Sequence, residues 1–244
     1  MLVLACHVML GDSTMNPESH STKPLRLALI GMSGTGKTFW AKRLAESGRS
    51  SISCDDRIEQ RLAPRLSGRG FVGINGVAAW MGWPDNATYA GREADYLAAE
   101  IHTLDEILTA LERNPLQELV LDTTGSVIYA GNNLLMRLRR QMTVVYLAAS
   151  ESEQQLLTER YLSDPKPVLW RGAFLPRPGE APRETVARCY PTLIAARRRS
   201  YEALAHCTLP VAELRDTSRD ASRDAPLDAA AFLAMIGKKL EGAR

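Results

Sequence analysis

Residues 31–38 of this 244-residue chain read Gly-Met-Ser-Gly-Thr-Gly-Lys-Thr, which fits the pattern Gly-x-x-x-x-Gly-Lys-Thr. Glycines at these positions let the backbone curl so that successive N–H groups point inward and form a nest for an anion. Lys37 is placed to reach the outer phosphates of a ligand, and the Thr38 hydroxyl can take one position on Mg²⁺. The spacing therefore predicts a phosphate-binding loop formed by Gly31, Met32, Ser33, Gly34, Thr35, Gly36, Lys37 and Thr38.

The residues on either side of this loop support that prediction. Residues 25–30 form a short apolar run that is typical of a buried strand, and residues 38–45 place apolar side chains at helical spacing. Gly48 is a suitable end for the helix. Because the N-terminus of such a helix is positively polarised, it favours an anion at the loop.

The composition indicates one sizeable domain with an apolar core and no strongly charged partner. Hydrophobic residues make up 45% of the chain, and 30 Lys and Arg balance 28 Asp and Glu, so the net charge is +2. This balance gives no indication of nucleic acid or an acidic membrane as a partner. Four scattered cysteines without zinc or Cys-x-x-Cys spacing favour a reducing, cytoplasmic location: Cys6, Cys54, Cys189 and Cys207.

Strand and helix patterns alternate along the chain, which predicts an α/β fold with a central parallel sheet and helices on both faces. We expect a domain over residues 24–213, including a loop-like lid at about 163–183 that holds several prolines. Residues 1–23 are expected to be a disordered extension, 214–226 a solvated linker and 227–244 a C-terminal helix. The remaining expected strands are 51–54, 119–121, 143–147 and 207–211, and the remaining helices are 58–66, 92–111, 132–141, 152–162 and 184–205.

Carboxylates follow two of the expected strands. Asp122 comes directly after three aliphatic residues, where a carboxylate is suited to hold Mg²⁺ or its waters. Asp55 and Asp56 end the second strand, where an aspartate could orient an acceptor hydroxyl and take its proton. The same pair could simply cap the helix that begins near Ile58, and the two interpretations are compatible. The small residues 123–126 form a turn at which a substrate could approach the backbone.

Basic residues mark the later part of the chain. Arg160 and Lys166 flank a proline-containing loop and could close over a nucleotide to neutralise charge on a transferring phosphoryl group. Alternatively, Arg160 and Lys166 could be ordinary surface residues without a role in binding. A run of arginines follows at 197–199, of which one is expected to face inward.

Several segments in order resemble the motifs of one known family. The phosphate-binding loop is followed by residues 53–59, Ser-Cys-Asp-Asp-Arg-Ile-Glu, which are similar to an Asp-x-Asp-x-x-Ile-Glu segment. Residues 122–126 stand where that family has a Gly-Gly-Gly turn, and residues 166–169, Lys-Pro-Val-Leu, look like its Arg-Pro-Leu-Leu lid. Arg197 precedes Tyr201 with the spacing of the family's substrate-binding arginine helix. The chain thus resembles the shikimate kinases, within the nucleoside-monophosphate-kinase-like P-loop group, from about residue 25 to 211.

This resemblance implies the three-layer P-loop NTPase fold, ATP and Mg²⁺ as ligands, and phosphoryl transfer to an alcohol. The chain also departs from the family. Ser53 replaces an aspartate that helps to hold Mg²⁺ in the family, so we interpret Asp122 as a relocated metal carboxylate. Leu97 stands where the family has a substrate arginine, and Lys166 replaces the arginine of the lid. Losing a bidentate arginine costs about 1.5–3 kcal/mol, so shikimate itself is not the expected acceptor.

The hypothesis that we favour is an ATP-dependent kinase for a small hydroxylated metabolite. The expected catalytic residues are Lys37, Asp55 and Lys166; the nucleotide site is Gly31–Thr38 with Arg160; the substrate residues are Asp55, Gly125 and Arg197; and the metal residues are Thr38 and Asp122. Arg197 would suit an acceptor with a carboxylate or a phosphate.

Two alternatives remain open. A nucleoside or nucleotide kinase could stack a base on Trp80, Trp83 and Tyr89, although core packing is the commoner use of tryptophan. An ATP-binding regulatory protein without metabolic turnover would account for the weakened substrate motifs. The oligomeric state is not predicted.

Overall fold

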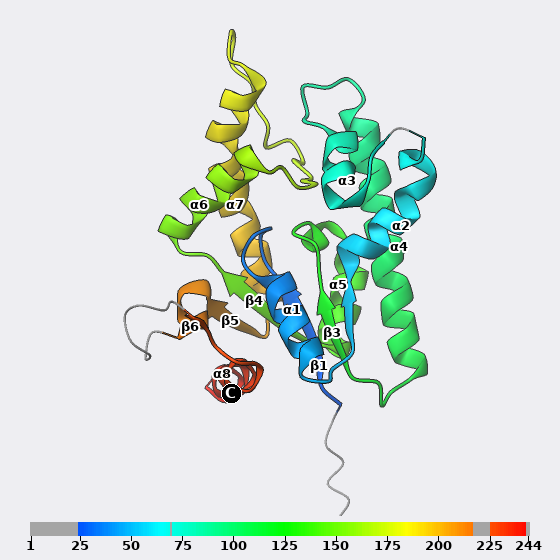
Figure 1. Cartoon of the computed structure of the whole chain (residues 1–244), viewed down its shortest axis with the longest axis vertical. Coiled ribbons are helices and arrows are strands. Elements are labelled where there is room, and N and C mark those ends of the chain that lie inside the picture. Colours follow the sequence, from blue (N-terminus) through cyan, green and yellow to red (C-terminus); the bar gives the residue numbers. More distant parts are fainter. Residues whose placement is uncertain (1–23, 69, 217–224, 243–244) are drawn as a thin grey trace, which may run out of the picture.

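The computed structural model describes residues 24–68, 70–216 and 225–242. Its centre is a five-stranded parallel sheet with the strand order β2-β3-β1-β4-β5 (Figure 1). The strands of this sheet are β1 (Arg26–Ile30), β2 (Ser51–Ser53), β3 (Leu119–Asp122), β4 (Thr143–Ala148) and β5 (Cys207–Pro210). A separate antiparallel pair consists of β6 (Arg215–Asp216) and β7 (Ala225–Pro226).

Helices connect these strands, as parallel pairing requires. They are α1 (Lys37–Glu46), α2 (Cys54–Leu66), α3 (Gly73–Met81), α4 (Tyr89–Arg113), α5 (Asn132–Gln141), α6 (Glu151–Ser163), α7 (Pro182–Leu204) and α8 (Ala229–Glu241). The short 3-10 helices η1 (Val127–Tyr129) and η2 (Val211–Leu214) follow β3 and β5. No described helix combines the length and the apolar character needed to cross a membrane.

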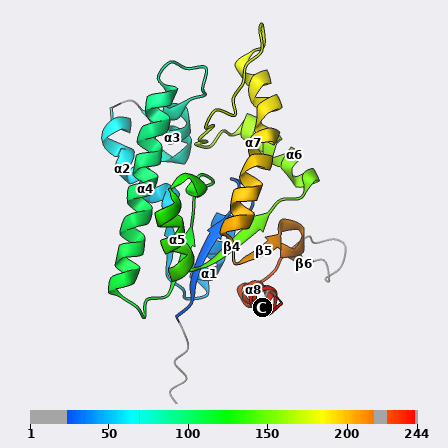
Figure 2. The same cartoon turned by 180° about the vertical axis from the view of Figure 1, so that it is seen from behind.

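The sheet is covered on both faces, as its alternating side chains require. In β1, Leu27 and Leu29 join the apolar cluster of α1 and α8, whereas Ala28 and Ile30 join the cluster under α4, α5 and α7. Figures 1 and 2 show the two helical layers from opposite sides. All four side chains are almost fully buried because strands of a parallel sheet lie between two apolar layers. The predicted three-layer α/β fold is confirmed.

Helix α4 extends beyond the expected range 92–111 at both ends, and two other helical elements differ more from the sequence-based expectation. Helix α2 begins at Cys54 rather than near Ile58, because Ser53 caps it: the Asp56 N–H donates to Ser53 Oγ at 3.2 Å. Helix α3 forms in the Gly- and Asn-containing stretch 67–91, for which no element was predicted. The predicted disordered extension 1–23 and most of the predicted linker lie outside the described residues.

The C-terminal helix α8 completes the layer over α1. The rings of Phe232 and Trp40 stack with centroids 4.1 Å apart and an interplanar angle of 8°. Phe232 and Ile236 are buried in the cluster that includes the β1 side chains Leu27 and Leu29. The helix is therefore part of the core, which its sequence pattern alone did not determine.

We predict that Phe232→Ala lowers the free energy of unfolding by about 3 kcal/mol, because it removes a fully buried ring and leaves a cavity against Trp40. Phe232→Leu keeps most of the volume and should cost about 1 kcal/mol. Denaturant unfolding measures both changes. If Phe232→Ala lowered the free energy of unfolding by less than Phe232→Leu does, this result would contradict the packing.

Two helical arms rise beyond the carboxyl ends of the strands. Helices α2, α3 and α4 form one arm, and α6 and α7 form the other (Figures 1 and 2). A cavity of about 450 Å³ lies between them and extends from the loop after β1 to α3. This is the edge of an open α/β sheet where ligands generally bind.

Candidate active site

The phosphate-binding loop connects β1 to α1 and forms the floor of the cavity. Gly31 has φ +140°, and a Cβ there would lie 2.8 Å from the Leu147 carbonyl oxygen, so only glycine fits. Gly36 has φ +96° directly before α1. The backbone thus turns sharply at both ends of the loop, as an anion nest requires.

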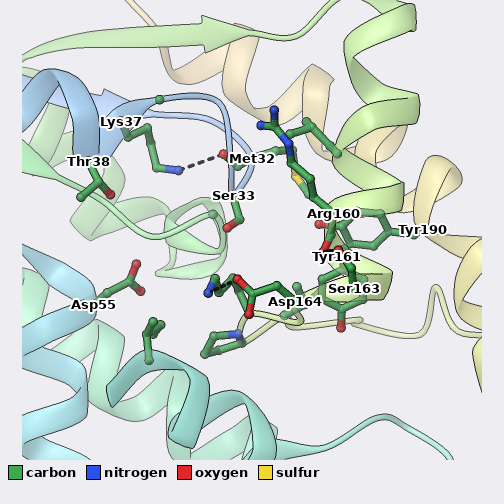
Figure 3. Close-up of a pocket in the computed structure, with 18 of the residues that line it drawn as sticks. Met32, Ser33, Lys37, Thr38, Asp55, Arg160, Tyr161, Ser163, Asp164 and Tyr190 are labelled. Atoms are coloured by element: carbon green, nitrogen blue, oxygen red, sulfur yellow. Dashed lines mark hydrogen bonds and ion pairs between the residues drawn. The ribbon is translucent and has the colours of Figure 1, made fainter. Parts of the chain in front are cut away.

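Lys37 points into this loop and is buried, with 7% of its surface exposed. Its Nζ donates to the main-chain oxygens of Gly31 and Met32, both at 3.0 Å (Figure 3). Burial lowers the pKa of the Lys37 ammonium, and the nearby carboxylates of Asp122 and Asp55 oppose this shift. The two carbonyls hold the ammonium group at the position from which it could bind phosphate oxygens.

Asp122 ends β3 and is paired in register with Leu29 of β1, beside the loop. It is buried, with 4% of its surface exposed. Burial raises the pKa of its carboxyl group above the usual value, while the Lys37 charge and a hydrogen bond from the Thr38 side chain lower it. The structure therefore brings together Thr38 and Asp122, the two predicted metal residues.

The oxygen atoms of this pair fit Mg²⁺, which prefers carboxylate and hydroxyl ligands and keeps several waters. In the part of the chain that the structure describes, no three His, Cys, Asp or Glu side chains gather as a metal cage. A magnesium site here would consequently need phosphate oxygens and waters for its other positions, as is usual in nucleotide sites.

Asp55 lies in the first turn of α2 and lines the cavity. The Tyr96 hydroxyl donates to its Oδ1 at 3.4 Å. Burial raises the pKa of Asp55 to about 6, although the Lys37 charge opposes this. Asp56 is exposed and does not line the cavity. Asp55 is consequently the one of the two neighbouring aspartates that can contact a substrate.

The turn that follows β3 is held from two sides. The carbonyl oxygen of Gly125 accepts hydrogen bonds from Arg197 Nη1 at 3.0 Å and from the Tyr201 hydroxyl. Gly125 lines the cavity, and a Cβ there would lie 3.4 Å from Arg197 Nη1. On the other side, Glu100 Oε1 accepts from the hydroxyls of Thr124 and Ser126. The wall of the cavity at Gly125 is thus fixed by α4 and α7.

Glu100 was not expected from the sequence. It is 3% exposed, its Oε2 has no hydrogen-bond partner, and burial raises the pKa of its carboxyl group to about 7. One signal could have revealed it: Glu100 follows Tyr96 and precedes Leu104 at four-residue spacing, so it interrupts the apolar face of α4.

The pKa of Glu100 predicts how stability depends on pH. Because its carboxyl group keeps a proton up to about pH 7 in the folded protein, but only to about pH 4.5 when unfolded, folding stability falls as the pH rises between these values. We expect Glu100→Gln to remove this loss and to raise the free energy of unfolding at pH 8 by about 2 kcal/mol, with little change at pH 4.5.

Denaturant titrations between pH 4.5 and 8 check this expectation. Glu106→Gln is a suitable control on the same helix, since Glu106 is exposed and its ion pair with Arg61 lowers the pKa of its carboxyl group. That variant should show no gain at pH 8. A Glu100→Gln protein that is less stable than the wild type at pH 8 would show that the carboxylate is needed.

Arg197 is almost completely buried, with 2% of its surface exposed, but it still lines the cavity. Besides its bond to Gly125, its Nη2 donates to the Leu169 carbonyl oxygen at 2.7 Å. Its guanidinium group lies over the ring of Tyr129, 5.3 Å from the centroid, and its Nε has no partner. Of the arginine run 197–199, Arg197 is the inward-facing member.

The loop between α6 and α7 corresponds to the predicted lid segment at about 163–183. Arg160, near the end of α6, lines the cavity, and its side chain makes no hydrogen bond or ion pair among the described residues. Lys166 also lines the cavity, and its Nζ contacts Asp164 Oδ2 at 2.7 Å and Asn75 Oδ1 on α3. Figure 3 shows Asp164 and Asp55 on opposite sides of the cavity.

The aromatic residues that could stack a base do not line the main cavity. Trp80 is 3% exposed, and the Tyr89 hydroxyl donates to the Val168 carbonyl oxygen at 2.8 Å. The cavity instead has apolar or aromatic side chains that were not among the predicted site residues: Ile74, Leu157, Tyr161, Val168 and Tyr190. These residues come from α3, α6, α7 and the intervening loop, so only the fold brings them together.

Comparisons with known proteins show which solved structures share this fold. No protein-family model matches the sequence, and no curated protein shows significant sequence similarity to it. The chain is similar to the solved structure of shikimate kinase from Acinetobacter baumannii in complex with shikimate, with 23% identity and a TM-score of 0.56. That alignment covers 88% of this chain and 95% of the other.

Shikimate kinase from Bacteroides thetaiotaomicron is also similar, with 18% identity and a TM-score of 0.52, over 89% of this chain and 98% of that one. At this identity the similarity shows the fold. The resemblance predicted from the motifs is confirmed in that respect: the chain has the P-loop kinase fold of the shikimate kinases.

Proposed function

We propose that this protein is an ATP-dependent kinase that phosphorylates a hydroxyl group of a small metabolite. The observation that carries the proposal is the single cavity that joins the phosphate-binding loop to Asp55. Lys37 and Thr38 line it at the loop, and Asp55, Gly125 and Arg197 line it beyond the loop. A nucleotide phosphate and an acceptor hydroxyl could therefore lie next to each other in one cavity.

In the proposed reaction, the main-chain N–H groups of residues 31–38 hold the phosphates, with Arg160 beside them. Asp55 orients the acceptor hydroxyl and takes its proton. The acceptor oxygen forms a bond to the γ-phosphorus as the bond to the bridging oxygen of ADP breaks. Lys37 and Lys166 stabilise the charge on the transferring group. Lys166 must exchange its contact with Asp164 or Asn75 to do so.

Mg²⁺, held by Thr38 and Asp122, would supply charge neutralisation for the phosphates. Gly125 and Arg197 shape the acceptor side of the cavity. With its buried, unpaired cysteines Cys54, Cys189 and Cys207, the described part of the chain suits a reducing cytoplasm, where ATP is plentiful. We propose no nucleic-acid or membrane partner.

The experiment that tests this function is ADP release with Mg-ATP across a panel of hydroxylated metabolites. The panel includes sugar alcohols, sugar acids, nucleosides, nucleoside monophosphates, and the shikimate that the Acinetobacter baumannii structure contains. An acceptor-dependent signal that is absent from a Lys37→Met variant would establish a kinase. ATP binding without any acceptor-dependent signal would refute the proposal and favour a regulatory role.

A further inference from the structure

In the part of the cavity that would hold the acceptor, both cations already have protein partners. We define the acceptor end by six of the lining residues beyond the phosphate-binding loop and α6: Asp55, Ile74, Gly125, Lys166, Val168 and Arg197. Its two cations are Lys166 and Arg197. An acceptor with a carboxylate or phosphate would need one of them to be free, since an unpaired anion in a buried site is costly.

Arg197 does not offer a free fork to an acceptor anion. Its two outer nitrogens donate to the carbonyl oxygens of Gly125, in the turn after β3, and of Leu169, in the loop between α6 and α7. Turning the guanidinium group toward an anion would leave these carbonyls without a charged donor. Nη1 also contacts Met32 Sδ at 3.8 Å, and Nε is fully buried, so no two neighbouring N–H groups remain open for a bidentate contact. The geometry makes Arg197 a connection between the turn and the lid.

Lys166 is paired with its neighbour, and the proposed reaction already uses its charge for the transferring phosphoryl group. Its Nζ contacts the Asp164 carboxylate and the Asn75 amide oxygen, and Asp164 also lines the cavity. Arg160 has no side-chain partner among the described residues, but it comes from α6 and also lines a small cavity with Gly34 and Thr35 of the phosphate-binding loop. Its charge is therefore placed for the nucleotide.

The carboxylate of Asp55 is the charge that faces the acceptor without an arginine partner. It contacts the Tyr96 hydroxyl, which is neutral, and the cation that opposes the rise of its pKa is Lys37, which the proposed reaction assigns to the phosphates. Asp164 lies across the cavity from it (Figure 3). Hydroxyl and ammonium groups can donate to such carboxylates, whereas an additional anion would be repelled.

On these grounds, and resting on the proposed kinase activity, we propose that the acceptor is an alcohol without a carboxylate or phosphate group, either neutral or positively charged. The remaining lining of the acceptor end agrees with this. Ile74 and Val168 present apolar surface, which suits the carbon skeleton of a polyol or amino alcohol.

The test compares acceptors that share hydroxyl groups but differ in charge. Suitable sets are glycerol, serinol and glycerate; glucitol, glucosamine and gluconate; and each nucleoside with its monophosphate. For each set we would measure kcat/KM from acceptor-dependent ADP release. We expect the neutral or cationic member to exceed the anionic member by about tenfold or more, the factor that corresponds to one missing charged contact.

A pair of variants tests whether the missing free cation causes this preference. Ile74→Arg adds a free guanidinium group to the acceptor end and should raise kcat/KM for the anionic members by about tenfold relative to the neutral ones. Ile74→Gln is the matched control, of similar length and without charge, and should not change the ratio.

The outcomes separate this inference from the function on which it rests. A wild-type preference for an anionic member would overturn the inference and leave the kinase standing. An Ile74→Arg protein with an unchanged ratio would overturn the charge argument. No acceptor-dependent ADP release from any set, with ATP still bound, would overturn the kinase proposal and the inference together.

Discussion

Replacing Lys37 with methionine is expected to lower acceptor-dependent ADP release by about 10³-fold while the protein stays folded. The Lys37 ammonium is the cation that the phosphate-binding loop itself directs at the phosphates, and methionine has a similar length without the charge. Binding of ATP should weaken less than turnover, because the main-chain N–H groups of the loop remain. Single-turnover ADP formation and direct ATP titration measure the two effects separately.

The stability of this variant should change little. Burial lowers the pKa of the Lys37 ammonium, which means that the folded protein holds this charge at a cost. Removing the charge relieves that cost, but the carbonyl oxygens of Gly31 and Met32 lose their donor. These opposing changes should leave the free energy of unfolding within about 1 kcal/mol of the wild type.

Lys42→Met provides the control, since Lys42 is an exposed lysine of the same helix and does not line the cavity. It should keep turnover within about twofold, as expected for a surface substitution. A Lys37→Met enzyme with more than a tenth of wild-type turnover would refute the assigned role of the loop.

The phosphate-binding loop could be predicted from the sequence because its function depends on consecutive residues. The turns at Gly31 and Gly36 and the ammonium of Lys37 all belong to one eight-residue segment, and local geometry decides their arrangement. The order of strands and helices could be predicted for a similar reason: apolar periodicity is local, and parallel pairing follows from the alternation.

The role of Arg197 could not be predicted in the same way. Its position on a helix and its inward direction follow from the sequence, and a carboxylate or phosphate partner was the natural expectation. Its observed partners are the main-chain oxygens of Gly125 and Leu169, which are 72 and 28 residues away. Any residue type supplies a carbonyl oxygen, so no sequence pattern marks such a contact.

The distinction between Asp55 and Asp56 also depended on the structure. The two residues are adjacent, and the expected helix start near Ile58 left both outside the helix. Capping by Ser53 moves the start of α2 to Cys54, so that the first turn directs Asp55 at the cavity and Asp56 at solvent. A shift of one turn at a helix end, which sequence patterns locate poorly, decides which aspartate can contact a substrate.

This assignment predicts that Asp55→Asn lowers acceptor-dependent ADP release by about 10²- to 10⁴-fold, the usual contribution of a general base, whereas Asp56→Asn stays within about twofold. The wild-type kcat/KM should rise with pH through about 6 as Asp55 ionises, and the Asp55→Asn enzyme should lack this rise. Measuring both variants between pH 5 and 8, with ATP binding followed in parallel, separates loss of the base from loss of the nucleotide.

Unfolding cannot account for the expected loss of activity. Since burial raises the pKa of Asp55 above its unfolded value of 3.8, its contribution to stability is present below that pH and is lost as the pH rises through about 6. The Asp55→Asn protein should therefore be more stable than the wild type at pH 8, where its activity relative to the wild type is lowest. If the two aspartate variants instead lost activity equally, together with stability, then the pair would act only as the cap of α2, and the acceptor would have to be oriented by other residues.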